Sequence, residues 1–97
     1  MLTHVVFFKL NDRTPENAQK LREVLLSMTG KISQIKHMEV GVNVLPSERA
    51  FDVVLFQRFD SLADLQDYQA HPEHQEVLKY IRAVVASSAS VDYEGAA

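Results

Sequence analysis

The chain opens with Leu2-Thr3-His4-Val5-Val6-Phe7-Phe8-Lys9-Leu10, a run rich in the β-branched and aromatic residues that favour a β-strand. Side chains alternate across a strand, so Val5 and Phe7 lie on one face and the other face carries Leu2, His4, Val6, Phe8 and Leu10. Apolar residues on both faces indicate a strand that is covered from both sides. The run from Phe51 to Phe59 repeats this pattern, so we expect these two runs to be the central strands of one sheet.

Two helical regions separate the expected strands. Thr14 is a favourable N-cap and is followed by Pro15, a residue suited to the first helical position. Apolar residues then recur every three or four positions until Gly30, which predicts a helix over about residues 15–29. Ser61 is the expected N-cap of the second region, and Pro72 interrupts and restarts that helix.

Two more runs alternate like strands. Residues 35–45 have one apolar and one polar face, which predicts a strand near the sheet edge, and residues 87–94 form a final strand. The order β-α-β-β-α-β is typical of the ferredoxin-like α+β fold, with a four-stranded antiparallel sheet and both helical regions on one face. The apolar residues of the other face would leave an exposed patch that monomers rarely tolerate, so we expect a twofold homodimer in which two sheets face each other.

Composition fits one small domain over residues 1–97. Apolar residues make up 46% of the chain and charged residues 24%, which is ordinary for a globular protein. There is no cysteine, so disulfides and zinc–thiolate sites are excluded, and oligomerisation is the expected source of added stability. The formal net charge is −3 and the ten Lys and Arg residues are scattered, so we expect no nucleic-acid partner.

Segments for export or for membrane insertion are not expected. The first residues lack the basic start, long apolar centre and small-residue cleavage site of a signal peptide. No apolar run approaches the roughly 18 residues of a membrane span. We therefore expect a cytoplasmic protein without a membrane anchor.

The chemistry concentrates in Tyr68-Gln69-Ala70-His71-Pro72-Glu73-His74. This stretch holds one phenol and two imidazoles at the break between two helical segments, and the fold can bring His4 of the first strand towards it. His74 falls in the first turn of a helix, where the positive end of the helix dipole disfavours imidazolium. A His74 that stays neutral at pH 7 is able to act as a general base.

Several segments, in this order, are similar to one known family: His4 to Lys9, Glu39 to Asn43, Phe51-Asp52, Phe59 with Ser61, Tyr68 with His71 to His74, and Val91-Asp92-Tyr93. The chain resembles the stress-responsive dimeric α+β barrel (Dabb) family over nearly its whole length. It departs at Ala50-Phe51, where many relatives have Gly-Tyr. The resemblance implies a homodimer with a barrel-like core between two sheets, and a cleft between helices and sheet in each subunit.

One branch of this family suggests roles for individual residues. The plant polyketide cyclases that form olivetolic acid use a His of the first strand with a Tyr and a His of the helix break, and the matching positions are His4, Tyr68 and His74. The resemblance implies that His74 is the base for an intramolecular aldol closure, oriented by Tyr68, and that His71 contacts the substrate. No flavin, nicotinamide or phosphate-binding loop is visible in the sequence, so we expect no cofactor. The apolar pocket residues of those cyclases have no clear match in this chain.

Each residue also has a structural interpretation. His74 is then a half-buried residue bonded to a backbone group, and His4 is a partnered core histidine. Tyr68 is then a packing residue with its hydroxyl at the surface, and His71 is a helix-entry residue. His71 and His74 are three residues apart, but a transition-metal site needs further ligands, so we do not expect one.

Three functions compete at this level. The first is a small-molecule cleft for an apolar carbonyl compound, with a cofactor-independent aldol cyclase or lyase, or a cofactor-free monooxygenase, as the specific activities. The second is a structural, stress-related dimer without catalysis. The third is an RNA-recognition module, which shares the element order but needs exposed aromatic and basic residues on its central strands. The central run Val53 to Phe56 has no basic residue, which disfavours RNA.

Overall fold

The computed structural model describes residues 1–95 of the chain. It contains β1 (Leu2–Leu10), α1 (Pro15–Leu26), β2 (His37–Val42), β3 (Val53–Phe59), α2 (Leu62–Ala70), α3 (Pro72–Val84) and β4 (Val85–Glu94). Ala96 and Ala97, the end of the domain expected over residues 1–97, lie outside the described residues. Among residues 1–95, no helix is long and apolar enough to cross a membrane.

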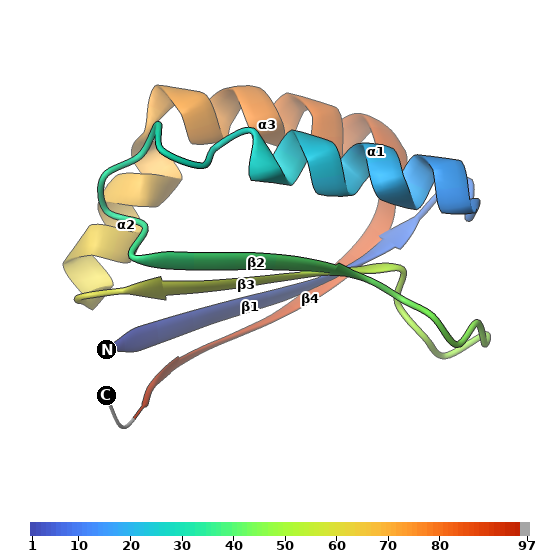
Figure 1. Cartoon of the computed structure of the whole chain (residues 1–97), viewed down its shortest axis with the longest axis horizontal. Helices are drawn as coiled ribbons and strands as arrows, with labels where there is room; N and C mark the ends of the chain where they lie inside the picture. The colour runs from blue at the N-terminus through green and yellow to red at the C-terminus, as the bar shows by residue number, and fades with distance from the viewer. Residues whose placement is uncertain (96–97) are drawn as a thin grey trace.

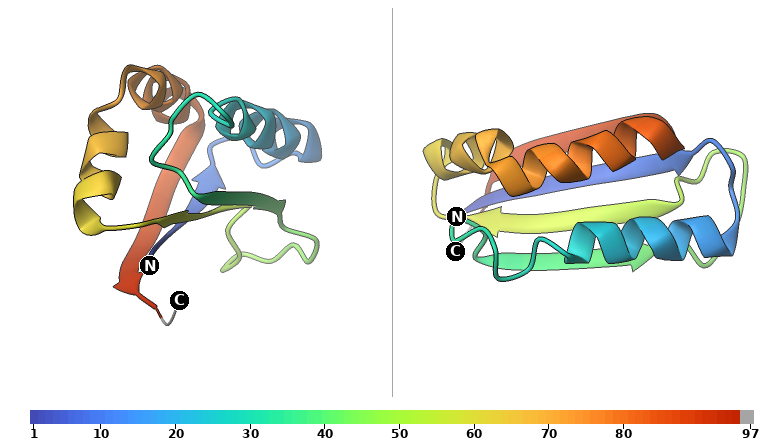
Figure 2. Two further views of the ribbon diagram at one scale, coloured as in Figure 1. Left: turned by 60° about the vertical axis from the view of Figure 1, so that its left-hand side comes forward. Right: turned by 90° about the horizontal axis from the view of Figure 1, so that it is seen from above.

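The four strands form one antiparallel sheet in the order β2-β3-β1-β4. β1 and β3 are the central strands, so the predicted ferredoxin-like α+β fold is confirmed. The helices cover one face of the sheet, with α1 and α3 lying side by side and α2 at one end (Figure 1 and Figure 2). The register sets His4 of β1 between Gln57 of β3 and Asp92 of β4.

The expected caps form, although three elements are shorter than predicted. The Asn17 amide donates to Thr14 Oγ1 at 3.1 Å, and the Asp64 amide donates to Ser61 Oγ at 3.1 Å. The first helix ends at Leu26 rather than near residue 29, and the chain then turns through Gly30, which has a φ of 77°. The second strand spans six residues within the predicted run 35–45, because its pairing with β3 runs only from His37 to Val42. The third strand begins at Val53 rather than at Phe51.

The hydrophobic core lies between the helices and the helix-facing side of the sheet. Its largest fully buried apolar members are Leu21 and Leu25 of α1, Met28, Phe59 of β3 and Tyr68 of α2. Two polar residues of the helix-facing side of the sheet, His4 and Gln57, are buried with them. A polar side chain in the core requires a partner, so His4 and Gln57 mark the sheet region where chemistry is to be sought.

No helix covers the other face of the sheet (Figure 1), and apolar side chains on this face are exposed. Phe7 is 42% exposed, Val91 60% and Tyr93 47%. Alternation places these residues on the face opposite His4. The two-sided apolar pattern of β1 therefore corresponds to one buried face and one uncovered face in a single chain.

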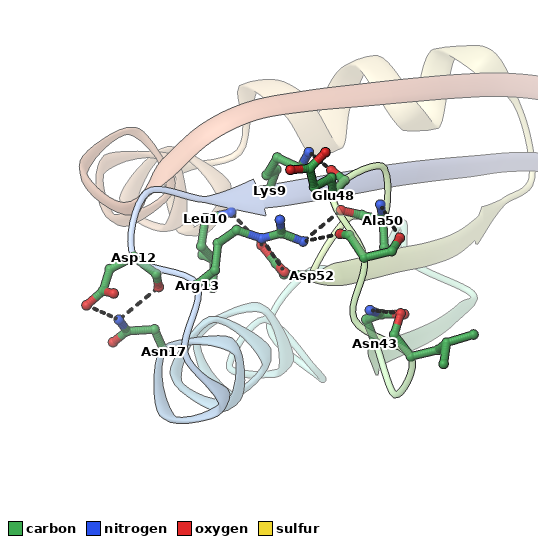
Figure 3. A network of polar contacts seen from close by, with 11 residues as sticks. Lys9, Leu10, Asp12, Arg13, Asn17, Asn43, Glu48, Ala50 and Asp52 are labelled. Atoms are coloured by element: carbon green, nitrogen blue, oxygen red, sulfur yellow. Dashed lines mark hydrogen bonds and ion pairs between the residues drawn. The ribbon is translucent and has the colours of Figure 1, made fainter.

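A polar network at the far end of the sheet holds the loop between β2 and β3 in place (Figure 3). Arg13 Nε lies 3.1 Å from Asp52 Oδ1, and Arg13 Nη2 donates to the carbonyls of Ser47 and Ala50 at 3.2 and 2.9 Å. Asp52 also accepts the Leu10 amide at 2.8 Å. A cavity of about 430 Å³ adjoins this network, but the Arg13 guanidinium beside it is engaged with the loop.

Candidate functional site

A cavity of about 390 Å³ lies between the helices and the sheet. Its apolar lining comes from β1, α1, β3 and α3: Val6, Phe8, Leu25, Leu55, Val77, Leu78 and Ile81. Its polar lining is His4, Tyr68, Gln69, His74, Ser88 and Ser90. The volume is near the lower end of the roughly 300–1,000 Å³ typical of small-molecule sites.

The cavity brings together three residues that are distant in sequence. The ring centroids of Tyr68 and His74 lie 4.4 Å apart, and those of His4 and Tyr68 lie 6.3 Å apart. Within the described part of the chain, no lining residue is Lys, Arg, Asp or Glu. An uncharged, largely apolar lining favours a neutral ligand, because an anion would have no counter-charge there.

Tyr68 is a neutral hydrogen-bond donor at this site. It is only 1% exposed, so the expectation of a surface hydroxyl is wrong. Burial raises its pKa to about 12, and a contact with the Gln57 side chain acts in the opposite direction. The phenol packs on Phe59, with ring centroids 5.1 Å apart. A phenol that keeps its proton at neutral pH can donate to an oxygen but cannot serve as the base.

His74 has the properties of a neutral base. Its pKa is lowered, first by burial and then by the positive potentials of His4, Arg82 and His71, while a backbone contact with Gln69 opposes the shift. Burial rather than the helix dipole is therefore the leading cause. His74 Nδ1 lies 3.0 Å from the Gln69 carbonyl oxygen, which can only accept, so Nδ1 carries the hydrogen. The unprotonated atom is Nε2.

His4 is buried and partnered, as one interpretation of the sequence expected. It is 8% exposed, and its Nδ1 pairs with a carboxylate oxygen of Asp92 on the neighbouring strand β4. The Asp92 carboxylate keeps partial contact with solvent, with 37% of its side chain exposed. Because β4 is an edge strand, the contact between His4 and Asp92 links the lining of the cavity to the edge of the sheet.

His71 has a capping position. Its Nδ1 accepts the Glu73 amide at 3.1 Å and caps α3, and its ring is not part of the lining described above. Its predicted contact with a substrate stays a prediction. Within residues 1–95, His, Asp and Glu side chains do not gather in groups of three that would suit a metal ion.

Sequence reasoning missed four polar groups around the cavity. Ser88, Ser90 and Asp92 share one face of β4, and their alternation was visible, but their position beside His4 depends on strand pairing. Gln57 is fully buried next to Tyr68, and its Oε1 has no hydrogen-bond partner. The only feature of the sequence that indicated this was that a polar residue stands at an inward-facing position of an otherwise apolar strand.

Comparison with known proteins identifies relatives along most of the chain. The family model of the stress responsive A/B barrel domain matches residues 2–95. A stress-response A/B barrel domain-containing protein of Arabidopsis thaliana is 30% identical over 82 residues, which cover 81% of this chain. The chain spans 30% of the length of that relative, so it corresponds to one part of the Arabidopsis protein.

Solved structures give the same fold. A dimeric protein of unknown function with a ferredoxin-like fold from Bacteroides fragilis is 35% identical, with a TM-score of 0.83, covering 97% of this chain and 95% of that chain. A hydroxynitrile lyase from Passiflora edulis has a TM-score of 0.80 at 15% identity, covering 95% of this chain and 90% of that chain. At that identity the second likeness concerns the fold alone.

Proposed function

The chain belongs to the stress-responsive A/B barrel domain family, and on that premise we propose that it binds a small neutral carbonyl compound between its helices and its sheet. We further propose that it catalyses cofactor-independent proton abstraction there, as an aldol cyclase or lyase would. One observation carries the proposal: His4, Tyr68 and His74 line a single, largely apolar cavity.

The chemistry follows from the hydrogen positions. His74 Nε2 takes a proton from the carbon next to the carbonyl group, and the electron pair of that C–H bond moves towards the carbonyl oxygen. The Tyr68 hydroxyl donates a hydrogen bond to this oxygen and stabilises the developing enolate. Attack of the enolate carbon on a second carbonyl closes an aldol bond, and the alkoxide that forms takes up the proton held by the His74 imidazolium. The reverse sequence cleaves such a bond. An apolar lining protects the enolate from water.

Ligand titration followed by NMR tests the binding step. We expect neutral ketones and aldehydes to shift the methyl signals of Leu55, Val77 and Ile81, whereas carboxylates of the same carbon skeleton leave them unchanged, because the cavity offers no counter-charge. In the variant Leu78→Trp the indole fills the cavity, and the shifts should disappear. Leu62→Trp is the matched control, since Leu62 is 53% exposed on α2 and does not line the cavity.

Three results would contradict this assignment. If carboxylates caused equal shifts, the uncharged lining would not select neutral ligands. Shifts that persist in Leu78→Trp would place binding elsewhere on the molecule. If no carbonyl compound in the series binds at millimolar concentration, the non-catalytic interpretation of the three residues gains the support instead.

We also propose that the functional unit is a homodimer formed through the uncovered face of the sheet. Phe7, Val91 and Tyr93 are exposed on that face, and the Bacteroides fragilis relative is a dimeric protein. Beside Phe7 the face has a hollow of about 360 Å³ at Gly41, where a side chain would meet Val54. The cavity with His74 lies between the helices and the sheet, away from this face, so each protomer would keep its own site.

Charge on this face should dissociate the dimer. Val91→Asp places a carboxylate in the apolar patch, and twofold symmetry repeats it, so a loss of about 1.4 kcal/mol per copy weakens association about a hundredfold. Light scattering during size-exclusion chromatography should show a shift towards the monomer mass. Leu62→Asp, an exposed leucine of α2 on the helix side, should stay dimeric. If Val91→Asp stayed dimeric, the interface would not lie on this face of the sheet.

A further inference from the structure

One polar contact beside the cavity is not used by the proposed chemistry. His4 Nδ1 pairs with Asp92 Oδ1 across the β1–β4 ladder, where the two residues are direct partners. A carboxylate at neutral pH only accepts, so the hydrogen of the His4 ring lies on Nδ1. The lone pair then lies on Nε2, on the opposite side of the ring.

Few groups near His4 can compete with Asp92 for the hydrogen of the His4 ring. Tyr68 faces it from α2, with ring centroids 6.3 Å apart, and the neutral His74 ring of α3 lies behind Tyr68, with ring centroids 4.4 Å apart. On its two neighbouring strands, its direct partners are Gln57 and Asp92. Of these groups only Asp92 is an anion, so it alone determines which ring nitrogen keeps the hydrogen.

We propose that Asp92 is a positioning residue that holds His4 as a hydrogen-bond acceptor at the cavity. The site then presents one donor, the Tyr68 hydroxyl, and two acceptors, the Nε2 atoms of His4 and His74. This inference rests on the proposed function and narrows its ligand class. A carbonyl compound that also carries a hydroxyl group, as an enol or phenol does, can bond Tyr68 through its carbonyl oxygen and His4 through its hydroxyl.

Nitrogen-15 NMR of the imidazole rings tests the arrangement without any ligand. In the wild-type protein at pH 7.5 we expect the His4 Nδ1 signal to be of the protonated type and its Nε2 signal of the unprotonated type. In Asp92→Asn the amide can donate to Nδ1, and the populations should shift towards the Nε2–H tautomer. Glu94→Gln is the matched control, because it removes a carboxylate two residues along the same face of β4 and should leave the His4 signals unchanged.

Ligand pairs test the consequence for specificity. Acetophenone and 3-hydroxyacetophenone differ by one hydroxyl group, and we expect the hydroxylated compound to bind the wild-type protein about tenfold more tightly. Asp92→Asn should abolish this difference while the affinity for acetophenone stays within about twofold, since a tenfold change corresponds to about one hydrogen bond. Glu94→Gln should keep the full difference.

The outcomes separate this inference from the proposed function. A wild-type His4 with the hydrogen on Nε2, or with hydrogens on both nitrogens, would overturn the inference whether or not ligands bind. The expected tautomer together with no binding of either compound would support the positioning role of Asp92 and count against the proposed function. Equal affinity for both compounds in the wild-type protein would overturn the narrower ligand class.

Discussion

Replacing His74 with glutamine should slow proton abstraction from a bound carbonyl compound by about 10²–10⁴-fold, the range over which a general base contributes to catalysis. The wild-type protein in deuterium oxide should exchange the hydrogens next to the carbonyl of a small ketone, which mass spectrometry detects as added mass. Exchange reports the first step of aldol chemistry and does not require the natural substrate. Glutamine keeps a polar side chain of similar size but cannot take the proton.

The matched control is His37→Gln. His37 lies on the edge strand β2, is exposed to solvent and does not line the cavity, so its replacement removes an imidazole that takes no part in the site. Exchange should continue at the wild-type rate in this variant. An equal fall in both variants would indicate non-specific catalysis by imidazole, and an unchanged rate in His74→Gln would refute the role of His74 as the base.

The pH dependence of exchange gives an independent check. Burial lowers the pKa of His74 below its ordinary value of 6.5, so the ring is already unprotonated at pH 7. The exchange rate should therefore be level around neutral pH and should fall only as the pH drops through the lowered pKa. A rate that still rises between pH 7 and 8.5 would assign the base to another group.

The fold was predictable because its signals are local. Alternation within β1 and β3 marks both as two-sided strands, and that property alone places them at the centre of the sheet. Thr14 and Ser61 mark helix starts by accepting an amide hydrogen three residues away. Element ends were less predictable, since the strand expected over residues 35–45 is limited by where its neighbour β3 begins and ends.

The site was predictable only in part because its contacts are long-range. Tyr68 and His74 are six residues apart, so their proximity follows from the helix break at Pro72. The pairing of His4 with Asp92 joins residues 88 positions apart and depends on the register of β1 with β4. The burial of Tyr68 depends on where α2 crosses the end of the sheet. The sequence of α2 gives little indication of this position, because the helix has nine residues and only two of them are buried.

Phe59→Ala should lower the free energy of unfolding by about 3–5 kcal/mol, because it leaves a cavity where a fully buried ring was. Domains of this size are stable by only about 5–15 kcal/mol, so the variant should melt more than about 10 °C below the wild-type protein. Thermal unfolding followed by circular dichroism measures the change at one fixed protomer concentration, since dimer formation adds to stability. Leu62→Ala, at an exposed position, should change the free energy by less than about 0.5 kcal/mol.

Phe59 also links the stability of the core to the geometry of the site. Its ring centroid lies 5.1 Å from that of Tyr68 and 6.4 Å from that of His4, so both rings rest on the same side chain. Phe59→Leu keeps part of the buried volume and should fold, but the two rings lose their planar support, so ligand affinity should fall although no residue that lines the cavity has changed. If Phe59→Leu bound ligands as the wild-type protein does, the positions of Tyr68 and His4 would have to be set by Gln57 and Asp92 alone. If Phe59→Ala lost less than about 1 kcal/mol, the ring would not be the shared support that its burial indicates.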